Sequence, residues 1–285
     1  MDKKLLLSAK DIEIEFTLRG KVLKAIRKCS LDVYDGETIA IVGESGSGKS
    51  VFTKSFLGML DANGSITGGS ILYEGVDISK YRTEKEWMGI RGKKISMVMQ
   101  DPMTSLNPLK KIGKQIQESI EINQGLKGEE ARKKAIEMME LVGINDAERR
   151  ADQYPHEFSG GMRQRAALIR TLALKPDILL LDEPFSALDY QTRLQVSADI
   201  SRIIRAEKKT ALLITHDLSE AISISDRVIV LSNRPASVKI QIPIRLTLPD
   251  DSMLAARNAP EFKTYFNLLW EELHDDTAGT IYQKT

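Results

Sequence analysis

Segments near the start of the chain alternate between apolar and charged residues, which is the pattern of strands with one buried and one exposed face. Residues 8–16 alternate in this way, and Arg19 and Gly20 then interrupt the pattern. A second alternating segment covers residues 22–33, and a short apolar segment at 68–75 is bounded by turns. We therefore expect the first part of the chain to be rich in strands joined by tight turns.

Other segments are apolar without alternation, as expected for strands that are buried on both faces. The clearest of these segments are 38–42, 95–99, 178–181 and 210–215. The helices that we expect cover residues 51–60, 111–142, 160–174, 190–206 and 260–270, and two further strands are expected at 227–231 and 238–242. Because strands and helices are interspersed along the chain, we predict an α/β fold.

The last predicted helix carries a stripe of aromatic and aliphatic side chains. Residues that share this face at helical spacing are Phe262, Tyr265, Phe266, Leu269 and Trp270. The stripe predicts that the helix packs onto the body of the protein. The tail at 274–285 is expected to be unstructured.

The composition is that of an ordinary soluble globular chain, with 42% apolar and 28% charged residues. A net charge of +1 does not favour nucleic acid as a partner, because nonspecific binding of nucleic acid needs an excess of basic side chains. Cys29 is the only cysteine, so an internal disulfide or a thiolate metal cluster is excluded, which fits a reducing cytosol. The apolar start is too short for a signal peptide, and no apolar run approaches a membrane span. We therefore expect any membrane role to depend on a partner.

A glycine-rich segment lies between the predicted strand 38–42 and the helix that follows it. Its residues are Gly43, Glu44, Ser45, Gly46, Ser47, Gly48, Lys49 and Ser50. Glycines let successive backbone N–H groups curl around an anion, and the helix directs its positive dipole end to the same point. This context favours a polyphosphate site over a chance match to the pattern. We predict that Lys49 reaches the β- and γ-phosphates of a nucleotide, that Ser50 helps to coordinate Mg²⁺, and that Val51 belongs to the same binding segment.

Two adjacent carboxylates follow the buried strand 178–181. Asp182 and Glu183 stand at the carboxyl end of that strand, where charges are costly unless they hold a cation or transfer a proton. An acidic turn without a function is the disfavoured alternative beside a phosphate loop. We predict that Asp182 holds Mg²⁺ through a water molecule and that Glu183 polarises the water that attacks the γ-phosphate.

Two further segments have both a functional and a purely structural interpretation. Ser159, Gly160 and Gly161 begin a predicted helix, where they form either an anion site or a plain helix cap. His216 follows the strand 210–215, where a histidine is usually packed or capping but can also donate a hydrogen bond to a γ-phosphate oxygen. The residues alone are compatible with both interpretations.

Taken in order, these motifs resemble the nucleotide-binding subunit of ATP-binding-cassette (ABC) transporters, over residues from about 5 to 235. The segments that carry the resemblance are 43–50, Gln100, 158–162, 179–183, 186–189 and His216. Phe158 and Met162 replace the Leu and Gln of the commonest Leu-Ser-Gly-Gly-Gln form, but the serine and the glycines remain, so phosphate contact should survive. The resemblance implies a P-loop NTPase (RecA-like) core with an antiparallel β subdomain and an inserted helical subdomain.

The resemblance also implies a division of the chain. Residues 1–102 would hold the antiparallel β subdomain and the first part of the P-loop core, and residues 103–172 the helical subdomain. Residues 173–235 would complete the core, and residues 236–285 would form a C-terminal strand, helix and tail.

The resemblance further implies that two subunits enclose two ATP molecules with Mg²⁺. The Ser159–Gly161 segment of one subunit would face the γ-phosphate bound by the other, and Asp189 would lie at the shared interface. Gln100 would act in catalysis and metal binding, and would link that site to the contact with a membrane partner. Phe16 falls where the family places its adenine-stacking aromatic residue, although an aromatic side chain on a strand is more often simple packing.

The implied partners are a second ATPase subunit, identical or different, transmembrane permease subunits and, through them, a solute-binding protein. Residues near Gln100 and within the helical subdomain would receive a coupling helix of the permease. The chain would then be a peripheral subunit at the cytoplasmic face of the membrane.

Features of the subfamilies divide between the two halves of the chain. Segments 43–50, 100–108 and 154–165 resemble oligopeptide, dipeptide and nickel importers, although that group usually ends in a cysteine-bearing extension. Segments 183–189 and 230–235, with the aromatic last helix, resemble nitrate, sulfonate and taurine importers. Because the coupling surface is expected in the first half, we predict a peptide-type membrane partner.

The function predicted from the sequence is therefore that of an ATPase subunit that energises uptake through a membrane importer. The alternative is a soluble cassette ATPase of DNA repair or of the ribosome. Such proteins usually carry a long coiled-coil insertion or a second cassette, for which this chain has no room. A GTPase is disfavoured because an Asn-Lys-x-Asp guanine reader is missing, and a kinase would not explain Ser159–Gly161 together with His216.

Overall fold

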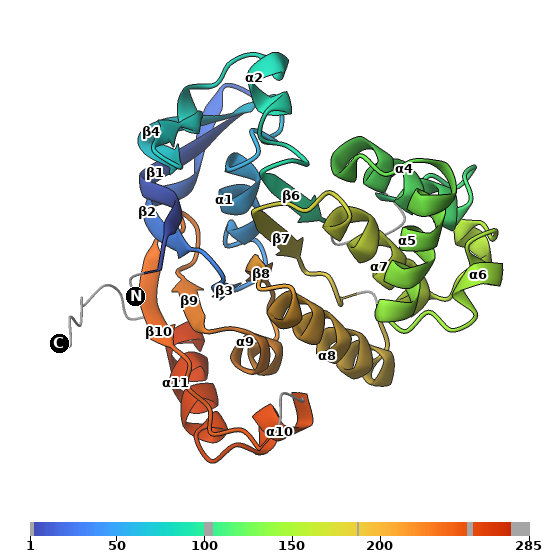
Figure 1. Ribbon diagram of the computed structural model, residues 1–285. Coiled ribbons are helices and arrows are strands. Elements are labelled where there is room, and N and C mark those ends of the chain that lie inside the picture. The colour runs from blue at the N-terminus through green and yellow to red at the C-terminus, as the bar shows by residue number, and fades with distance from the viewer. Residues whose placement is uncertain (1–2, 100–104, 187, 250–252, 275–285) are drawn as a thin grey trace. The chain divides into compact units, whose positions relative to one another are not determined.

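The computed structural model describes residues 3–99, 105–186, 188–249 and 253–274. The chain divides into two compact units, which we call unit 1 (residues 1–87 and 212–285) and unit 2 (residues 88–211). Figure 1 shows the elements of both units by label and colour.

Unit 1 contains a four-stranded antiparallel sheet in the order β2-β1-β4-β5 (Figure 1). Its strands are β1 (Leu5–Leu18), β2 (Lys21–Tyr34), β4 (Gly64–Tyr73) and β5 (Val76–Asp77). β1 and β2 confirm the predictions made from the alternating segments, and β4 confirms the short strand predicted between turns, whereas β5 was not predicted. β4 begins earlier than predicted, because its glycine-rich start pairs with β1 as far as the pair Phe16 and Gly64.

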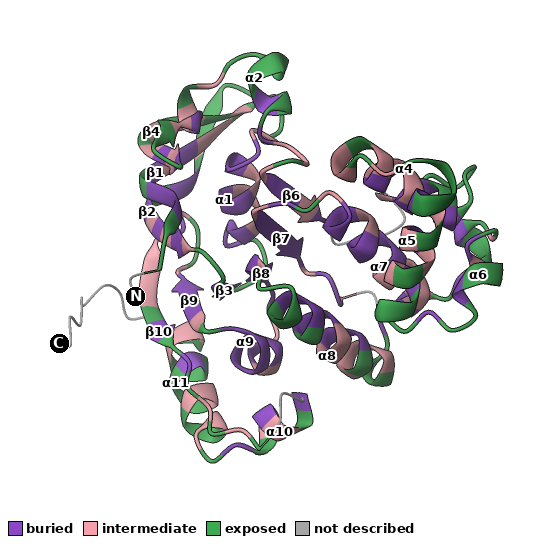
Figure 2. Cartoon of the chain, in the orientation of Figure 1, coloured by how far each residue is buried: buried purple, intermediate pink, exposed green. Residues whose placement is uncertain are grey.

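The remaining strands of unit 1 belong to a six-stranded sheet, in which they follow the order β10-β9-β3-β8. These strands are β3 (Thr38–Val42), β8 (Thr210–Ile214), β9 (Arg227–Leu231) and β10 (Val238–Pro243). β3 pairs with β9 in parallel and β10 pairs with β9 antiparallel. β3 and β8 are buried at every residue, as Figure 2 shows in purple, so the prediction from uniformly apolar segments is confirmed.

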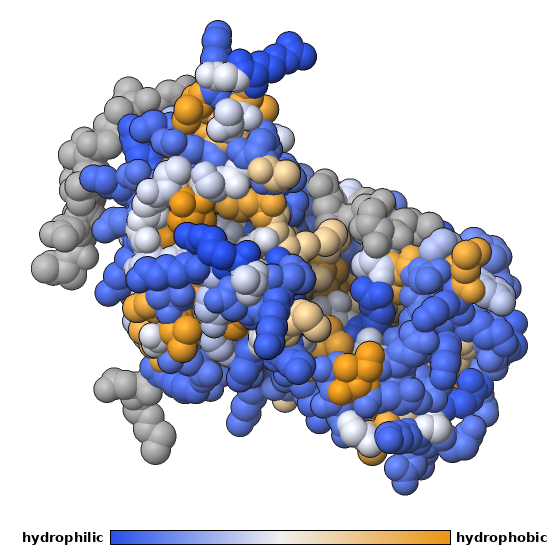
Figure 3. All heavy atoms as spheres, turned by 90° about the horizontal axis from the view of Figure 1, so that it is seen from above, coloured by the Kyte–Doolittle hydropathy of each residue, from blue (hydrophilic) through white to orange (hydrophobic). Residues whose placement is uncertain are grey.

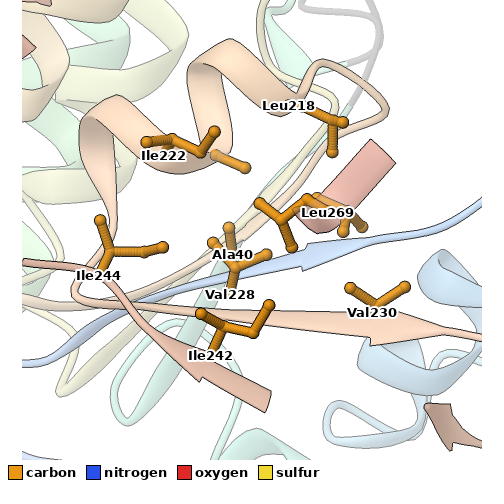
Figure 4. Close-up of a cluster of buried hydrophobic side chains, with 10 residues drawn as sticks. Ala40, Leu218, Ile222, Val228, Val230, Ile242, Ile244 and Leu269 are labelled. Atoms are coloured by element: carbon orange, nitrogen blue, oxygen red, sulfur yellow. The ribbon is translucent and has the colours of Figure 1, made fainter. Parts of the chain in front are cut away.

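Two helices of unit 1 cover this sheet. They are α9 (Leu218–Ile224) and α11 (Phe262–His274), and the shorter α10 (Met253–Asn258) precedes α11. Figure 4 shows Leu218 and Ile222 of α9 and Leu269 of α11 against Ala40 of β3 and Val230 of β9. Full burial of one such aliphatic side chain contributes about 1.5–3 kcal/mol to the free energy of folding.

The last helix packs onto this core, as its apolar stripe predicts. Leu269 is fully buried, and Phe262, Tyr265 and Phe266 pack partly buried against the same cluster. The prediction is wrong for Trp270, which is 51% exposed. The tail at 275–285 lies outside the described residues.

Helix α1 (Lys49–Ser55) of unit 1 is shorter than the predicted helix 51–60. The chain turns at Gly58, whose φ is +59°, and the Trp87 ring occupies the space where a β-carbon on Gly58 would lie, 2.2 Å from Cε2. Helix α2 (Glu84–Met88), which carries Trp87, is short and carries three charged residues, and the sequence pattern did not reveal it. A tertiary contact therefore ends α1 earlier than its own sequence predicts.

Unit 2 contains two parallel strands, β6 (Ile95–Val98) and β7 (Ile178–Asp182), in the register Ile95 to Ile178. Its helices are α4 (Ile112–Gln124), α5 (Gly128–Leu141), α6 (Ala147–Arg150), α7 (Gly160–Leu172) and α8 (Tyr190–Ala206). The predicted helical segment 111–142 is two helices, because Gly125 takes a φ of +73° and ends α4. α4, α5, α6 and α7 gather in one group in Figure 1.

No helix within the described ranges combines the length and the apolar content that crossing a membrane requires. On the face shown in Figure 3, hydrophilic side chains predominate and the hydrophobic ones form small separate patches.

Candidate functional site

The glycine-rich loop 43–50 joins β3 to α1 in unit 1, as predicted. Gly46 and Gly48 have φ values of +78° and +112°, which side chains other than glycine rarely adopt. A β-carbon on Gly48 would also lie 2.9 Å from Cδ1 of Ile26. A β-carbon on Gly43 would lie 2.9 Å from Oγ of Ser47. Conformation therefore favours glycine at positions 46 and 48, and packing favours it at positions 43 and 48. Without side chains at these positions, the backbone N–H groups of the loop are accessible to a ligand.

The side chain of Lys49 crosses this loop. Lys49 is 5% exposed, and its ammonium donates hydrogen bonds to the carbonyl oxygens of Gly43 and Glu44, each at 2.8 Å. Burying an ammonium is costly unless polar or charged groups compensate it. The carbonyl oxygens provide that compensation, and they hold a positive charge at the centre of the loop, where an anionic ligand would find it.

The loop also contains a hydroxyl group suited to a ligand. Oγ of Ser47 is buried and has no hydrogen-bond partner among the described residues. Leaving a buried polar group unsatisfied costs about 1–3 kcal/mol, which a ligand oxygen would recover. The orphaned hydroxyl, the loop amides and the Lys49 ammonium together fit a polyphosphate.

The residues that we predicted to hold Mg²⁺ offer oxygen donors only. Ser50, in the first turn of α1, supplies a hydroxyl, and Asp182, the last residue of β7, supplies a carboxylate that is 6% exposed. Within the described residues, no group of three or more His, Cys, Asp or Glu could hold a metal by itself. Mg²⁺ prefers oxygen ligands and commonly takes only one or two from the protein, so the chemistry of these donors fits it.

His216 lies between β8 and α9 in unit 1 and is exposed. The residues around it form a rigid capping network: Asp217 accepts hydrogen bonds from the backbone N–H groups of Ser219 and Glu220. The hydroxyl of Thr215 donates to the buried Glu220 at 2.8 Å. The capping group is therefore Asp217, and His216 is an exposed residue directly before this capped helix start.

Phe16 is half-buried on β1, beside Gly64 of β4. A β-carbon on Gly64 would lie 2.5 Å from Cε1 of Phe16, so the ring covers the face of the glycine. This contact is a packing role, and the side chain as a whole is only half-buried.

The two adjacent carboxylates stand at the end of β7 in unit 2. Asp182 is buried, whereas Glu183 is half-buried and has a φ of +44°. The amide and the hydroxyl of Ser186 both donate to the carbonyl oxygen of Glu183, at 3.2 and 3.0 Å. A left-handed backbone costs a residue with a β-carbon about 1–2 kcal/mol. This sharp turn directs Asp182 and Glu183 to different environments.

Ser159 is the N-cap of α7, and its side chain accepts a hydrogen bond from the backbone N–H of Met162 at 3.3 Å. The side chain is exposed. The following Gly160 is half-buried, and Gly161 is buried against Thr192 of α8. The structural interpretation as a helix cap therefore holds, and the exposure of Ser159 leaves its hydroxyl accessible to a ligand.

Asp189 is the N-cap of α8 and accepts a hydrogen bond from the backbone N–H of Thr192 at 3.0 Å. Hydrogen bonds from Thr192 lower the pKa of Asp189 below its ordinary value, so the carboxylate is charged at neutral pH. Asp189 is exposed. Ala187, two positions before Asp189, lies outside the described residues, as does the predicted site residue Gln100.

Unit 1 thus carries the phosphate loop with Val51, Phe16 and His216, and unit 2 carries Asp182, Glu183, Ser159–Gly161 and Asp189. Sequence reasoning missed two neighbours of these groups. The first is Asp217, for which the pattern Asp-x-x-Glu before α9 was an available capping signal. The second is Arg234, which donates a hydrogen bond to the carbonyl oxygen of Gly46 at 2.7 Å. No sequence pattern connects two residues 188 positions apart.

A family model described as "ABC transporter" matches residues 26–186. The chain is 49% identical over 230 residues to the oligopeptide transport ATP-binding protein AmiE of Streptococcus pneumoniae, which covers 81% of this chain and 65% of that protein. It is 43% identical over 226 residues to the dipeptide transport ATP-binding protein DppD of Bacillus subtilis, covering 79% of this chain and 67% of that one. The match therefore spans about two thirds of the length of these relatives.

Solved structures with the same fold include the dimeric post-hydrolysis state of the ATP-binding cassette MJ0796 bound to ADP and Pi. This structure has a TM-score of 0.72 and 27% sequence identity, and the match covers 84% of this chain and 99% of the other. The similarity supports the predicted fold, a P-loop NTPase core of the kind found in ATP-binding cassettes. The two named relatives agree with the peptide-type features of the first half of the sequence rather than with the nitrate-type features of the second half.

Proposed function

The chain belongs to the ABC transporter family, and from this membership we propose that it is the ATP-hydrolysing subunit of a peptide importer. The observation that carries the proposal is the loop 43–50, where glycine backbone, the orphaned Ser47 hydroxyl and the Lys49 ammonium together suit a triphosphate. Its relatives named as oligopeptide and dipeptide transport ATP-binding proteins support peptides as the transported class. The transport activity would couple ATP binding, closure of a dimer and hydrolysis to uptake.

We assign the chemistry to the following side chains. Lys49 leaves the carbonyl oxygens of Gly43 and Glu44 and pairs with the β- and γ-phosphates, where a full negative charge replaces neutral carbonyls. Glu183 accepts a proton from the attacking water, and His216 donates a hydrogen bond to a γ-phosphate oxygen. Mg²⁺, held by Ser50, by Asp182 through water and by Gln100, would neutralise charge on the phosphates.

In this proposal, each ATP site consists of two halves, and each half comes from a different subunit. Ser159 and the two following glycines of one subunit contact the γ-phosphate bound to the other, and Asp189 lies at the interface. The dimeric state of the related cassette bound to ADP and Pi supports this arrangement. The exposure of both Ser159 and Asp189 supports it as well. Phe16 stacks on the adenine ring with the part of its face that Gly64 does not cover.

The permease is proposed to dock on unit 2. A cavity of about 320 Å³ is lined there by Leu109, Lys110, Lys111, Lys114, Gln117, Glu118, Arg132, Ala151, Asp152 and Tyr154. Lys110 pairs with Glu118, and Lys111 and Arg132 both pair with Asp152, so the four cations of the lining face only two acids. Leu109 is 85% exposed. The excess of positive charge in this lining and the apolar Leu109 suit a cytoplasmic permease segment that carries both an acidic and an apolar residue.

The division of labour within the chain follows from this proposal. Residues 103–172, which include α4 to α7, act as the helical subdomain that contacts the permease. Residues 1–102 and 173–235 bind and hydrolyse the nucleotide, to which the Ser159–Gly161 segment of the other subunit adds its contact, and residues 236–285 support the core through α11. The chain acts as a peripheral subunit at the cytoplasmic face of the membrane, with a second ATPase subunit, the permease and, indirectly, a peptide-binding protein as partners.

The test is reconstitution. The chain is purified with its native permease partners and reconstituted into lipid vesicles. ATP hydrolysis is then measured with a peptide-loaded binding protein on the side of the membrane opposite to the ATPase subunits. Hydrolysis should rise with that protein and should vanish in the Lys49→Ala variant. A nitrate- or sulfonate-loaded binding protein is the matched control. Stimulation by the control protein alone would overturn the peptide assignment, and hydrolysis that responds to no transport component would favour a soluble cassette ATPase.

A further inference from the structure

One short segment of unit 1, residues 231–236, supports the phosphate loop from behind. It follows β9 and leads into β10, far from the loop in sequence. A β-carbon on Gly43 would lie 3.3 Å from the carbonyl oxygen of Leu231, and one on Gly48 would lie 3.8 Å from Cβ of Ala236. The first and last glycines of the loop therefore both face this segment.

Gly46, the middle glycine of the loop, contacts the same segment by a hydrogen bond. Nη2 of Arg234 donates to the carbonyl oxygen of Gly46 at 2.7 Å, a charge-assisted contact. The next amide, that of Ser47, donates to the carbonyl oxygen of Glu44 at 3.1 Å. Because a peptide group is planar, these two hydrogen bonds fix the orientation of the Gly46–Ser47 peptide from both sides.

The segment that carries Arg234 is itself held in place. The amide of Ala236 donates to the carbonyl oxygen of Ala25 at 2.9 Å, and the amide of Arg27 donates to the carbonyl oxygen of Ala236 at 2.8 Å. The amide of Ser232 donates to the carbonyl oxygen of Ser237 at 2.9 Å. The two bonds of Ala236 tie the segment to β2, and the bond between Ser232 and Ser237 closes the turn, so Arg234 extends from a fixed base to the rim of the loop.

We propose that Arg234 is a positioning residue for nucleotide binding, which holds the Gly46–Ser47 peptide in the form that accepts a phosphate and adds a permanent positive charge at the rim of the loop. This inference rests on the proposed function of the loop. Arg234 is exposed, so its contact with Gly46 contributes little to the core, and its effect falls on the ligand rather than on the fold.

The test compares Arg234→Ala with Arg245→Ala in the full chain. Arg245 is also an exposed arginine of unit 1, and the contact recorded for it is a hydrogen bond from its backbone N–H to the hydroxyl of Tyr265, which the substitution leaves in place. Affinity for ATP is measured by calorimetric titration, and the KM and kcat of ATP hydrolysis are measured separately. We expect Arg234→Ala to raise the dissociation constant and the KM about tenfold with kcat retained, since removal of a charge-assisted hydrogen bond weakens binding by about that factor. Arg245→Ala should match the wild type.

Two further measurements separate positioning from folding. The melting temperature of Arg234→Ala without nucleotide should equal that of the wild type, and millimolar guanidinium ion should restore part of its ATP affinity by occupying the vacated place. Unchanged ATP affinity in Arg234→Ala overturns the inference while the proposed function stands. A lowered melting temperature without guanidinium rescue also overturns it, because the contact is then structural. Absence of ATP binding by the wild type would refute the proposed function itself.

Discussion

Gly161 of α7 lies against Thr192 of α8, so that a β-carbon on the glycine would be 2.7 Å from Cγ2 of the threonine. The adjacent Gly160 differs, because a β-carbon there would meet Leu188 Cδ2 at an ordinary 3.7 Å. Packing of α7 on α8 therefore requires glycine at position 161. At position 160 the described contacts leave room for a methyl group. Packing therefore does not require glycine there, and the space beside Gly160 is available to a ligand.

Alanine substitutions at these two positions should therefore have different effects. Gly161→Ala should lower the free energy of unfolding by about 1–3 kcal/mol through overpacking against Thr192. Gly160→Ala should leave stability unchanged or raise it by up to about 1 kcal/mol, since alanine favours a helix. It should nevertheless impair ATP-driven dimerisation. Urea unfolding and light scattering check both expectations, and equal loss of stability in the two variants would contradict the packing account.

The two roles of Ser159, capping and ligand contact, can be separated by one substitution. Aspartate is as good an N-cap as serine, so Ser159→Asp should keep the stability of α7. It also places a negative charge where a γ-phosphate of the second subunit is proposed to bind. We expect unchanged thermal unfolding but no ATP-driven dimer in light scattering. The same dimerisation as in the wild type would show that Ser159 acts only as a cap.

Docking of the permease on unit 2 can be tested with paired surface variants. Leu109→Glu and Lys114→Glu should each abolish copurification with the permease, because they remove the apolar contact or reverse the charge beside the cavity. Ile122→Glu is the matched control, since Ile122 is 77% exposed, lies on α4 as Lys114 does, and does not line the cavity. Copurification that fails equally in the control would mean that any added acid on α4 is harmful, and would contradict the assignment of the cavity.

Cys29 provides a probe of the β2 region. The side chain is fully buried, and burial raises the pKa of its thiol to about 12. At pH 8 only about one thiol in ten thousand is then ionised, and the thiolate is the reactive form. We expect the native protein to react with a disulfide reagent only in urea, where one thiol per chain should appear. Rapid reaction of the folded protein would contradict the burial of β2.

Sequence patterns predicted those parts of the fold whose environment is uniform along the segment. β3, β7 and β8 are buried at every residue, so their apolar runs were sufficient. α8 begins at Tyr190 and ends at Ala206, as predicted, since Asp189 provides a strong N-terminal cap. The phosphate loop was recognisable because its chemistry depends on local backbone geometry, which a short motif specifies.

The features that escaped prediction depend on contacts between distant segments. The end of α1 is set by packing of Trp87 on Gly58, and Trp270 is exposed because α11 buries only one side of its aromatic stripe. The hydrogen bond between Arg234 and Gly46 joins residues that no local pattern relates. Short helices such as α9, with seven residues, give too little periodicity to be detected.

The most direct test of the account is ATP binding and turnover by Glu183→Gln. Glutamine keeps the size of the side chain but cannot accept a proton from water, so turnover should fall about a hundredfold or more while ATP is still bound. Light scattering with ATP and Mg²⁺ should then show a stable dimer that retains two ATP molecules, and Glu207→Gln, an exposed acid at the end of α8, should behave as the wild type. A Glu183→Gln protein that hydrolyses ATP at the wild-type rate, or that stays monomeric with bound ATP, would contradict the account.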